Sequence, residues 1–296
     1  MSNETEPSGG RQNLSPKRAA QETIDGFRYR RNRHGGVLKL VLACLVFLFG
    51  ITAYLFSVET NPITGERQRV AFTTDEEIEL GLQSRGMIAS EMGGVLSDEL
   101  PIARKVDQVG NQLVQELEGW LARKDVENPF VFEFHVLADQ NTVNALALPG
   151  GQIFITRGLL AELTRDDQLA AVLSHEIGHV VHRHASQRMA KAQLKMRSAM
   201  ALQTATEGSE SASVALLLSE LLELRYGRKQ ELESDAYAIS LMSDAGYDTE
   251  GMIELLNILE NAGGSGVPEF LNTHPHPESR REQIREMIEL ERVNAA

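Results

Sequence analysis

Apolar residues change their spacing several times along the chain, and these changes mark its structural elements. The longest apolar run, LVLACLVFLFGITAYLF, covers residues 40–56 and contains no charge. Helical spacing predicts helices over about 75–92, 98–121, 157–164, 167–187, 212–226, 228–246, 249–262 and 277–291. Partial alternation predicts short strands over 130–137, 143–148 and 152–156. The pattern therefore predicts a mainly α protein with a small β-sheet, which belongs to the α+β class.

The apolar run near the N-terminus predicts a membrane-spanning helix. With Val37 and Leu38 it contains about twenty residues, enough to cross a hydrocarbon core of ~30 Å. A buried core helix usually carries a polar stripe, and a signal peptide has a shorter apolar stretch, so we favour a retained anchor. Cations crowd its N-terminal side: Arg28, Arg30, Arg31, Arg33 and Lys39. The positive-inside rule then places the N-terminus in the cytoplasm and the body outside it, in the periplasm of a bacterium.

Four parts follow from this division of the chain. We expect a disordered basic cytoplasmic tail over 1–35, because that stretch is polar and has no apolar periodicity. A transmembrane signal-anchor helix over 36–58 and a turn-rich linker over 59–72 come next. Residues 73–296 form one soluble domain.

Composition excludes several classes of protein. The 296 residues carry a formal net charge of −13. Seven Lys/Arg against four Asp/Glu give residues 1–35 a net of +3, so the remainder carries −16. Phosphate contacts need clustered cations, and so acidic a body is a poor candidate for binding nucleic acid. The only cysteine is Cys44, which excludes a disulfide framework and a cysteine zinc site. Any metal must be held by histidine and carboxylate.

The sequence His175-Glu176-Ile177-Gly178-His179 carries the strongest chemical signal. It is an H-E-x-x-H motif inside the helix predicted over 167–187. Residues at i and i+4 share one helical face, so both imidazoles can bind a single Zn²⁺. Glu176 lies beside such an ion, where it can accept a proton from the attacking water and later deliver it to the leaving amine.

A zinc site of this kind needs a third protein ligand and an open position. The metzincin pattern requires histidine at position 185, which is Ala185 here. We interpret His182 and His184 as surface or packing residues. Glu231 and Asp235 are also i,i+4, so one carboxylate can bind the metal while the other orients a ligand histidine. Spacing alone does not separate Glu231 from Glu233.

Four stretches, in this order, resemble the HtpX/BepA family of zinc metallopeptidases, which also contains the CaaX prenyl endopeptidase. They are residues 144–151 (NALALPGG), 175–179 (HEIGH), 231–235 (ELESD) and 273–280 (THPHPESR). The similarity covers roughly residues 73–292, and Ser234 replaces the alanine of the family's E-x-x-A-D pattern. The resemblance implies a zincin-like fold in which His175, His179 and Glu231 hold one zinc ion per chain. It favours Glu231 over Glu233.

The resemblance also implies that His274 and Arg280 approach the site. Either can stabilise the oxyanion of the tetrahedral intermediate, and His274 can alternatively occupy the open position of zinc in a resting enzyme. A polar loop residue is a further interpretation of His274. The segment 144–151 is expected to be an edge strand, to which an extended substrate adds through main-chain hydrogen bonds at Asn144, Ala145, Leu146 and Ala147. The alternative is a plain hairpin turn.

The sequence therefore predicts a membrane-anchored zinc-dependent endopeptidase of the bacterial inner membrane, with its peptidase domain in the periplasm. We expect it to cleave unfolded or extended proteins in quality control of the cell envelope. A metal-binding, non-catalytic scaffold or chaperone of the same fold is the alternative, and the presence of Glu176 favours the enzyme. The glycine-rich stretch 261–267 is a candidate lid that restrains activity.

Overall fold

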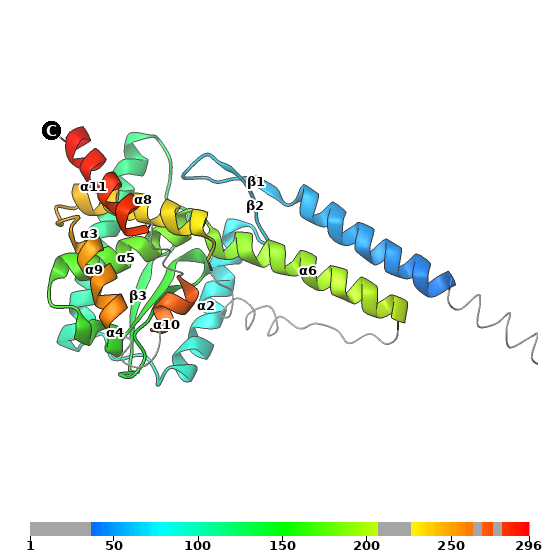
Figure 1. Cartoon of the computed structure of the whole chain (residues 1–296), viewed down its shortest axis with the longest axis horizontal. Helices are drawn as coiled ribbons and strands as arrows, with labels where there is room; N and C mark the ends of the chain where they lie inside the picture. Colours follow the sequence, from blue (N-terminus) through cyan, green and yellow to red (C-terminus); the bar gives the residue numbers. More distant parts are fainter. Residues whose placement is uncertain (1–36, 207–225, 263–267, 275–279, 296) are drawn as a thin grey trace, which may run out of the picture. The chain divides into compact units, whose positions relative to one another are not determined.

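The computed structural model describes residues 37–206, 226–262, 268–274 and 280–295 (Figure 1). They fall into two compact units. The first unit contains residues 37–50 and 196–206, and the second contains residues 51–195 and 226–295.

The first helix is Val37–Phe56. It is followed in chain order by β1 (Val58–Thr60), β2 (Arg67–Arg69), α2 (Thr74–Glu91), α3 (Pro101–Arg123), β3 (Glu133–Leu137), β4 (Ala145–Ala147), the 3₁₀ turn η1 (Pro149–Gly151), β5 (Gln152–Thr156), α4 (Arg157–Glu162), α5 (Asp166–Val181), α6 (His184–Thr206), α8 (Arg228–Asp244), α9 (Gly251–Asn261), α10 (Glu269–Thr273) and α11 (Arg280–Ala295). The predicted class, mainly helical with a small sheet, is confirmed. The predicted tail over 1–35 lies outside the described residues, and the helix over 212–226 and the loop over 261–267 lie mostly outside them.

Two helical segments make up the first unit. The first helix is long and apolar enough to cross a membrane. Arg197 of α6 packs against it, with the guanidinium 5.6 Å from the centre of the Phe49 ring. A Cβ added at Gly50 would lie 3.1 Å from the Cβ of Arg197, so glycine leaves the space that this arginine occupies.

A hairpin replaces most of the linker that we predicted over 59–72. Strands β1 and β2 pair antiparallel, with Val58 opposite Arg69. The side chain of Asn61 organises the turn: its Oδ1 accepts hydrogen bonds from two backbone amides, and its Nδ2 donates to the carbonyl of Val181 at 2.8 Å. Three-residue strands show too little alternation to be recognised in the sequence, and the turn residues dominate the local pattern.

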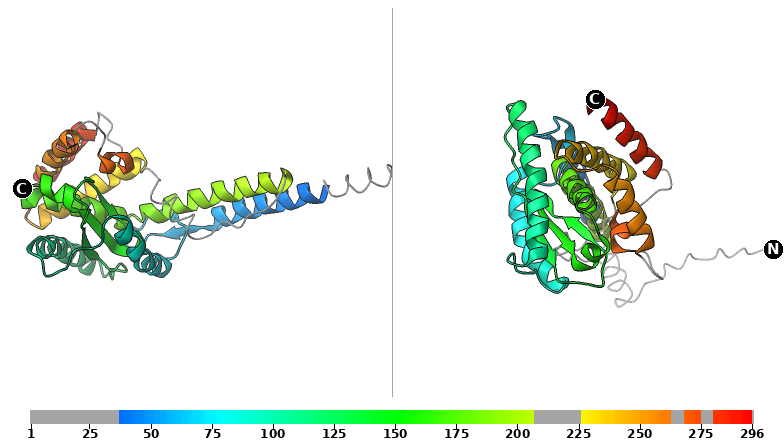
Figure 2. Two further views of the ribbon diagram at one scale, coloured as in Figure 1. Left: turned by 90° about the horizontal axis from the view of Figure 1, so that it is seen from below. Right: turned by 90° about the vertical axis from the view of Figure 1, so that its left-hand side faces the viewer.

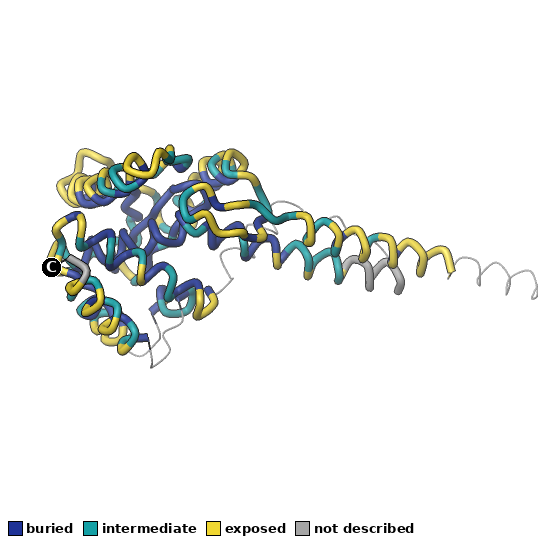
Figure 3. The backbone as a smooth tube through the Cα atoms, turned by 90° about the horizontal axis from the view of Figure 1, so that it is seen from above, coloured by how far each residue is buried: buried dark blue, intermediate teal, exposed yellow. Residues whose placement is uncertain are grey.

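The second unit has helices on both faces of its sheet. The strand order is β3-β5-β4, with β3 parallel and β4 antiparallel to β5. Helices α3 and α5 share one apolar cluster with Phe134, Ile153 and Ile155 of the strands, so they lie on the same face of the sheet. Ile88 of α2 packs with Phe154 on the other face. In Figure 2, α8, α9 and α11, yellow to red, lie on the opposite side of this unit from α2, cyan. Every residue of α5 from Gln168 to Val181 is buried. In Figure 3 the buried stretches run through the middle of this unit.

The helix predicted over 167–187 is split, which corrects the sequence analysis. Helix α5 ends at Val181, and α6 begins at His184. Between them Arg183 adopts the left-handed conformation, with φ 56°, where the α-helix cannot continue. Its side chain is buried and contacts Glu77 of α2. This long-range ion pair compensates for the break, which local spacing does not reveal.

Candidate metal and catalytic site

Two helices bring the predicted metal ligands together. His175 and His179 lie on α5, and Glu231 lies on α8. The two helices cross at Gly178 and Ser234: a Cβ added at Gly178 would lie 3.0 Å from the Cα of Ser234. Small residues at this point therefore allow the backbones to approach closely enough for the three side chains to converge.

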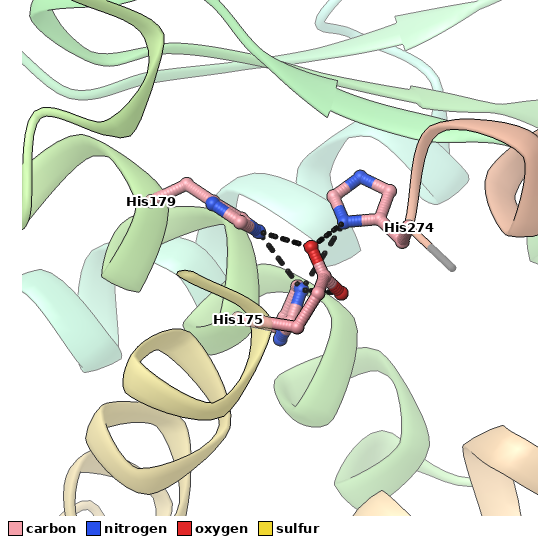
Figure 4. A group of neighbouring side chains, drawn as sticks. His175, His179 and His274 are labelled. Atoms are coloured by element: carbon pink, nitrogen blue, oxygen red, sulfur yellow. Dashed lines mark hydrogen bonds and ion pairs between the residues drawn. The ribbon is translucent and has the colours of Figure 1, made fainter. Parts of the chain in front are cut away.

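The donor atoms of these residues form a compact group (Figure 4). The Nε2 atoms of His175 and His179 are 3.1 Å apart, and the carboxylate oxygens of Glu231 lie 3.6 Å and 3.5 Å from them. Tetrahedral ligands at ~2.0–2.1 Å from a zinc ion are roughly 3.3 Å from one another. Two neutral imidazole nitrogens and a buried carboxylate at these separations fit one zinc ion.

His274 belongs to the same group. Its Nδ1 lies 3.3 Å from the Nε2 of His175 and 3.2 Å from the Oε1 of Glu231. The ring is buried and stacks on Phe270, with the ring centres 4.3 Å apart. Donor atoms of all four residues lie within 4.8 Å of one another. These contacts do not support the interpretation of His274 as a polar loop residue.

Asp235 and Arg280 hold the ligands in place. The Oδ1 of Asp235 faces the Nδ1 of His175 at 2.9 Å, which leaves the Nε2 of that ring directed at the metal position. Arg280 donates two hydrogen bonds of 2.7 Å to Asp235 and contacts Glu231 at 2.9 Å. Burial opposes ionisation of Asp235, but the charge and hydrogen bonds of Arg280 hold its pKa below the usual range. These contacts support a positioning role for Arg280 and not a contact with the oxyanion.

His184 is a component of the site that the sequence analysis missed. It is fully buried, its Nδ1 lies 2.9 Å from the Nδ1 of His179, and its Nε2 lies 3.3 Å from Glu233. These hydrogen bonds are satisfied when the Nδ1–H of His179 donates to the Nδ1 of His184 and the Nε2–H of His184 donates to the carboxylate of Glu233. The Nε2 of His179 then stays free to face the metal position. Our interpretation of His184 as a surface or packing residue is therefore incomplete. His182, in contrast, lies outside the donor group. Its Nδ1 lies 2.9 Å from the carbonyl oxygen of Gly178, and its ring centre lies 5.3 Å from that of His184.

Glu176 occupies the position expected of a general base. It is fully buried, and its Oε1 lies 3.7 Å from the Nε2 of His274. Burial raises the pKa of Glu176 to about 8, and the nearby charge of Glu231 adds to the effect. A carboxyl group whose pKa lies near neutrality is suited to taking up and releasing a proton during one reaction cycle.

A cleft of about 350 Å³ opens beside this group. The predicted substrate-binding segment forms one wall, through Asn144, Leu146 and Ala147. Among the described residues, strand β4 pairs only with β5 and is an edge of the three-stranded sheet, as predicted. The side chain of Ala145 packs in the core and does not line the cleft. Ile88 and Met92 line the cleft from the segment of α2 and its C-cap.

The fold and the donor set define a zinc metallopeptidase of the H-E-x-x-H type. The pattern of peptidase family M48 matches residues 107–288, and the chain belongs to this family.

Named relatives agree with the family. The chain is 27% identical over 256 residues to the mitochondrial metalloendopeptidase OMA1 of Saccharomyces cerevisiae, which covers 81% of this chain and 72% of the relative. It is 28% identical over 243 residues to the beta-barrel assembly-enhancing protease of Escherichia coli, covering 77% of this chain and 47% of the relative. It therefore spans about half the length of the second protein. The predicted class, a zinc metalloendopeptidase, is confirmed.

Proposed function

We propose that this protein is a membrane-anchored endopeptidase that cleaves extended or unfolded segments of other proteins. One observation carries the proposal: the four donor atoms and the buried Glu176 lie beside a cleft whose wall is an edge strand, with no second neighbouring strand among the described residues. A complete donor set with a base next to it favours catalysis over a metal-binding scaffold.

The residues of the chain divide the catalytic work. His175, His179 and Glu231 would hold the zinc ion. When bound, zinc supplies Lewis acidity that polarises the scissile carbonyl and makes water a stronger acid. Glu176 accepts the proton of the attacking water and transfers it to the leaving amine, and its burial keeps bulk water from taking its place.

The edge strand presents the substrate. The carbonyl of Asn144 and the amide of Leu148 bond to β5, at 3.0 Å and 2.8 Å. Hydrogen-bonding direction alternates along an antiparallel strand, so the main-chain groups of Ala145 and Ala147 face away from β5. A substrate that adds there as a further strand is recognised mainly through its backbone. Cleavage then tolerates many sequences but requires an extended chain.

The first helix anchors the enzyme. Four arginines lie close before this helix, and the first arginine after it is Arg67. This difference in charge supports a cytoplasmic N-terminus and a peptidase domain outside the cytoplasm. In a bacterial inner membrane this orientation corresponds to a periplasmic domain, to which misfolded envelope proteins are accessible. One relative is named a beta-barrel assembly-enhancing protease, which agrees with a role in envelope quality control.

His274 holds the resting enzyme in check. Its Nδ1 lies 3.3 Å from the Nε2 of His175 and 3.2 Å from the Oε1 of Glu231, so His274 would compete with the attacking water for the metal. We expect His274→Ala to raise basal casein cleavage at unchanged zinc content, and Asn272→Ala, on the neighbouring turn of α10 and outside the donor group, to leave it unchanged. Abolished cleavage in His274→Ala would instead assign this residue to the oxyanion.

Removal of the metal tests the proposed function. We expect a chelator to reduce casein cleavage by the full chain in detergent to background, because catalysis needs the Lewis acidity of the bound ion. One equivalent of zinc should restore cleavage. Folded substrates of similar size should resist cleavage. One bound zinc without cleavage, in both the wild type and His274→Ala, would establish the scaffold instead.

A further inference from the structure

A second cavity, of about 200 Å³, lies apart from the catalytic cleft. The last turn of the first helix, the hairpin β1–β2, α6 and α8 each contribute to its walls. Its charged lining consists of four cations and two acids: Arg67, Arg69, Lys191, Lys229, Glu66 and Glu233. The lining is therefore net positive in a chain whose formal charge is −13.

The backbone directs these cations to one place. In β2, Gln68 is buried and the two arginines on either side of it are exposed, so both arginines project from the same face of the hairpin. Lys191 follows Gln187 by four residues on α6, and both line the cavity. Lys229 pairs with Glu233 at 2.9 Å. Within the described ranges, no carboxylate lies within ion-pair distance of Arg67, Arg69 or Lys191.

The position of the cavity selects its ligand. Tyr54 lines the cavity and belongs to the last turn of the helix that ends at Phe56. The guanidinium of Arg69 lies 5.4 Å from the centre of the Tyr54 ring. Tyrosine at a helix end is typical of the membrane–water interface, at the level of the lipid headgroups. Guanidinium and ammonium groups at that level meet the phosphates of the lipid.

We propose that this cavity binds the phosphate-containing headgroup of an anionic phospholipid in the leaflet from which the first helix emerges. Arg67, Arg69 and Lys191 supply the charge, and Tyr54 supplies the contact with the glycerol region. A soluble phosphate offers nothing to the tyrosine ring, so the lipid is the ligand that uses the whole lining. The proposal rests on the membrane anchor proposed above and is independent of catalysis.

Native mass spectrometry of the full chain in nonionic detergent tests this site. Phosphatidylglycerol and phosphatidylcholine with the same acyl chains are added at equal concentration. We expect the wild type to retain phosphatidylglycerol several-fold better, and Arg67→Gln/Arg69→Gln/Lys191→Gln to retain the two lipids equally. The matched control carries three changes on or directly after α3, Arg104→Gln, Arg123→Gln and Lys124→Gln. It removes the same charge from exposed positions outside the cavity and should keep the preference.

Two further measurements test whether the ligand is a lipid or soluble phosphate, and whether the variants are folded. Inorganic phosphate at the same concentration should leave lipid retention unchanged. Displacement of the lipid by inorganic phosphate would show a site for soluble phosphate and overturn the proposal, as would equal retention of the two lipids by the wild type or a preference that survives the triple change. Zinc content and casein cleavage of the same samples show that each variant is folded, and separate failure of this site from failure of the proposed function.

Discussion

Replacement of Glu176 by glutamine is expected to lower the rate of casein cleavage by about 10²–10⁴-fold while one zinc ion stays bound, the usual range for loss of a general acid–base group. Glutamine has nearly the shape of glutamate but cannot accept the proton of the attacking water. Glu176 does not belong to the group of four donor residues, so the metal site should survive the change. Cleavage rate and zinc content are measured on the same samples.

A matched control for this variant is Glu162→Gln, which removes one negative charge at an exposed position on α4. It should cleave casein at the rate of the wild type. A Glu176→Gln protein that keeps both zinc and full activity would show that another group transfers the proton. Loss of zinc from the variant would place Glu176 among the ligands, against the geometry of the site.

Replacement of Arg183 by methionine is expected to reduce the free energy of unfolding by about 3–5 kcal/mol, the usual result of removing one partner of a buried ion pair. The arginine side chain is almost fully buried and contacts Glu77 at 2.8–2.9 Å, Glu59 at 2.8 Å and the carbonyl of Phe72 at 2.7 Å. Methionine keeps much of the apolar volume but leaves the buried Glu77 without its counter-charge. Urea unfolding of the full chain in detergent measures the loss.

A second variant separates the unpaired charge from the lost packing. Arg183→Met combined with Glu77→Leu removes both buried partners, and such paired replacement is often close to neutral. We therefore expect the double variant to recover most of the stability that the single variant loses. If the free energy of unfolding of Arg183→Met lay within about 1 kcal/mol of the wild-type value, the ion pair of Arg183 and Glu77 would contribute no more than an exposed ion pair does.

The parts of the site that could be predicted are those in which ligands follow one another at helical spacing. His175, Glu176 and His179 lie on one uninterrupted helix, and the i,i+4 relation of Glu231 and Asp235 is likewise local to α8. The choice between Glu231 and Glu233 depends on how α8 is rotated against α5. That rotation follows from the contact between the two helices, and the resemblance supplied it where spacing did not.

Other parts could not be predicted, because long-range contacts decide them. His184 reaches His179 only because the chain leaves the helical conformation at Arg183, and this break depends on Glu77, far earlier in the sequence. An uninterrupted helix would turn His184 away from the site. The hairpin β1–β2 was missed for a related reason, since its turn is fixed to the carbonyl of Val181 at the end of α5.

The crossing of α5 and α8 at Gly178 and Ser234 has a consequence for folding. A zinc ion held by His175, His179 and Glu231 would tie together two helices whose ligands are separated by a long intervening segment. Closing such a loop restricts the unfolded chain in the way that a disulfide does, and the chain has a single cysteine and can form no internal disulfide. Binding of the ion and docking of α8 are then one equilibrium, so the metal also acts as the crosslink of the domain.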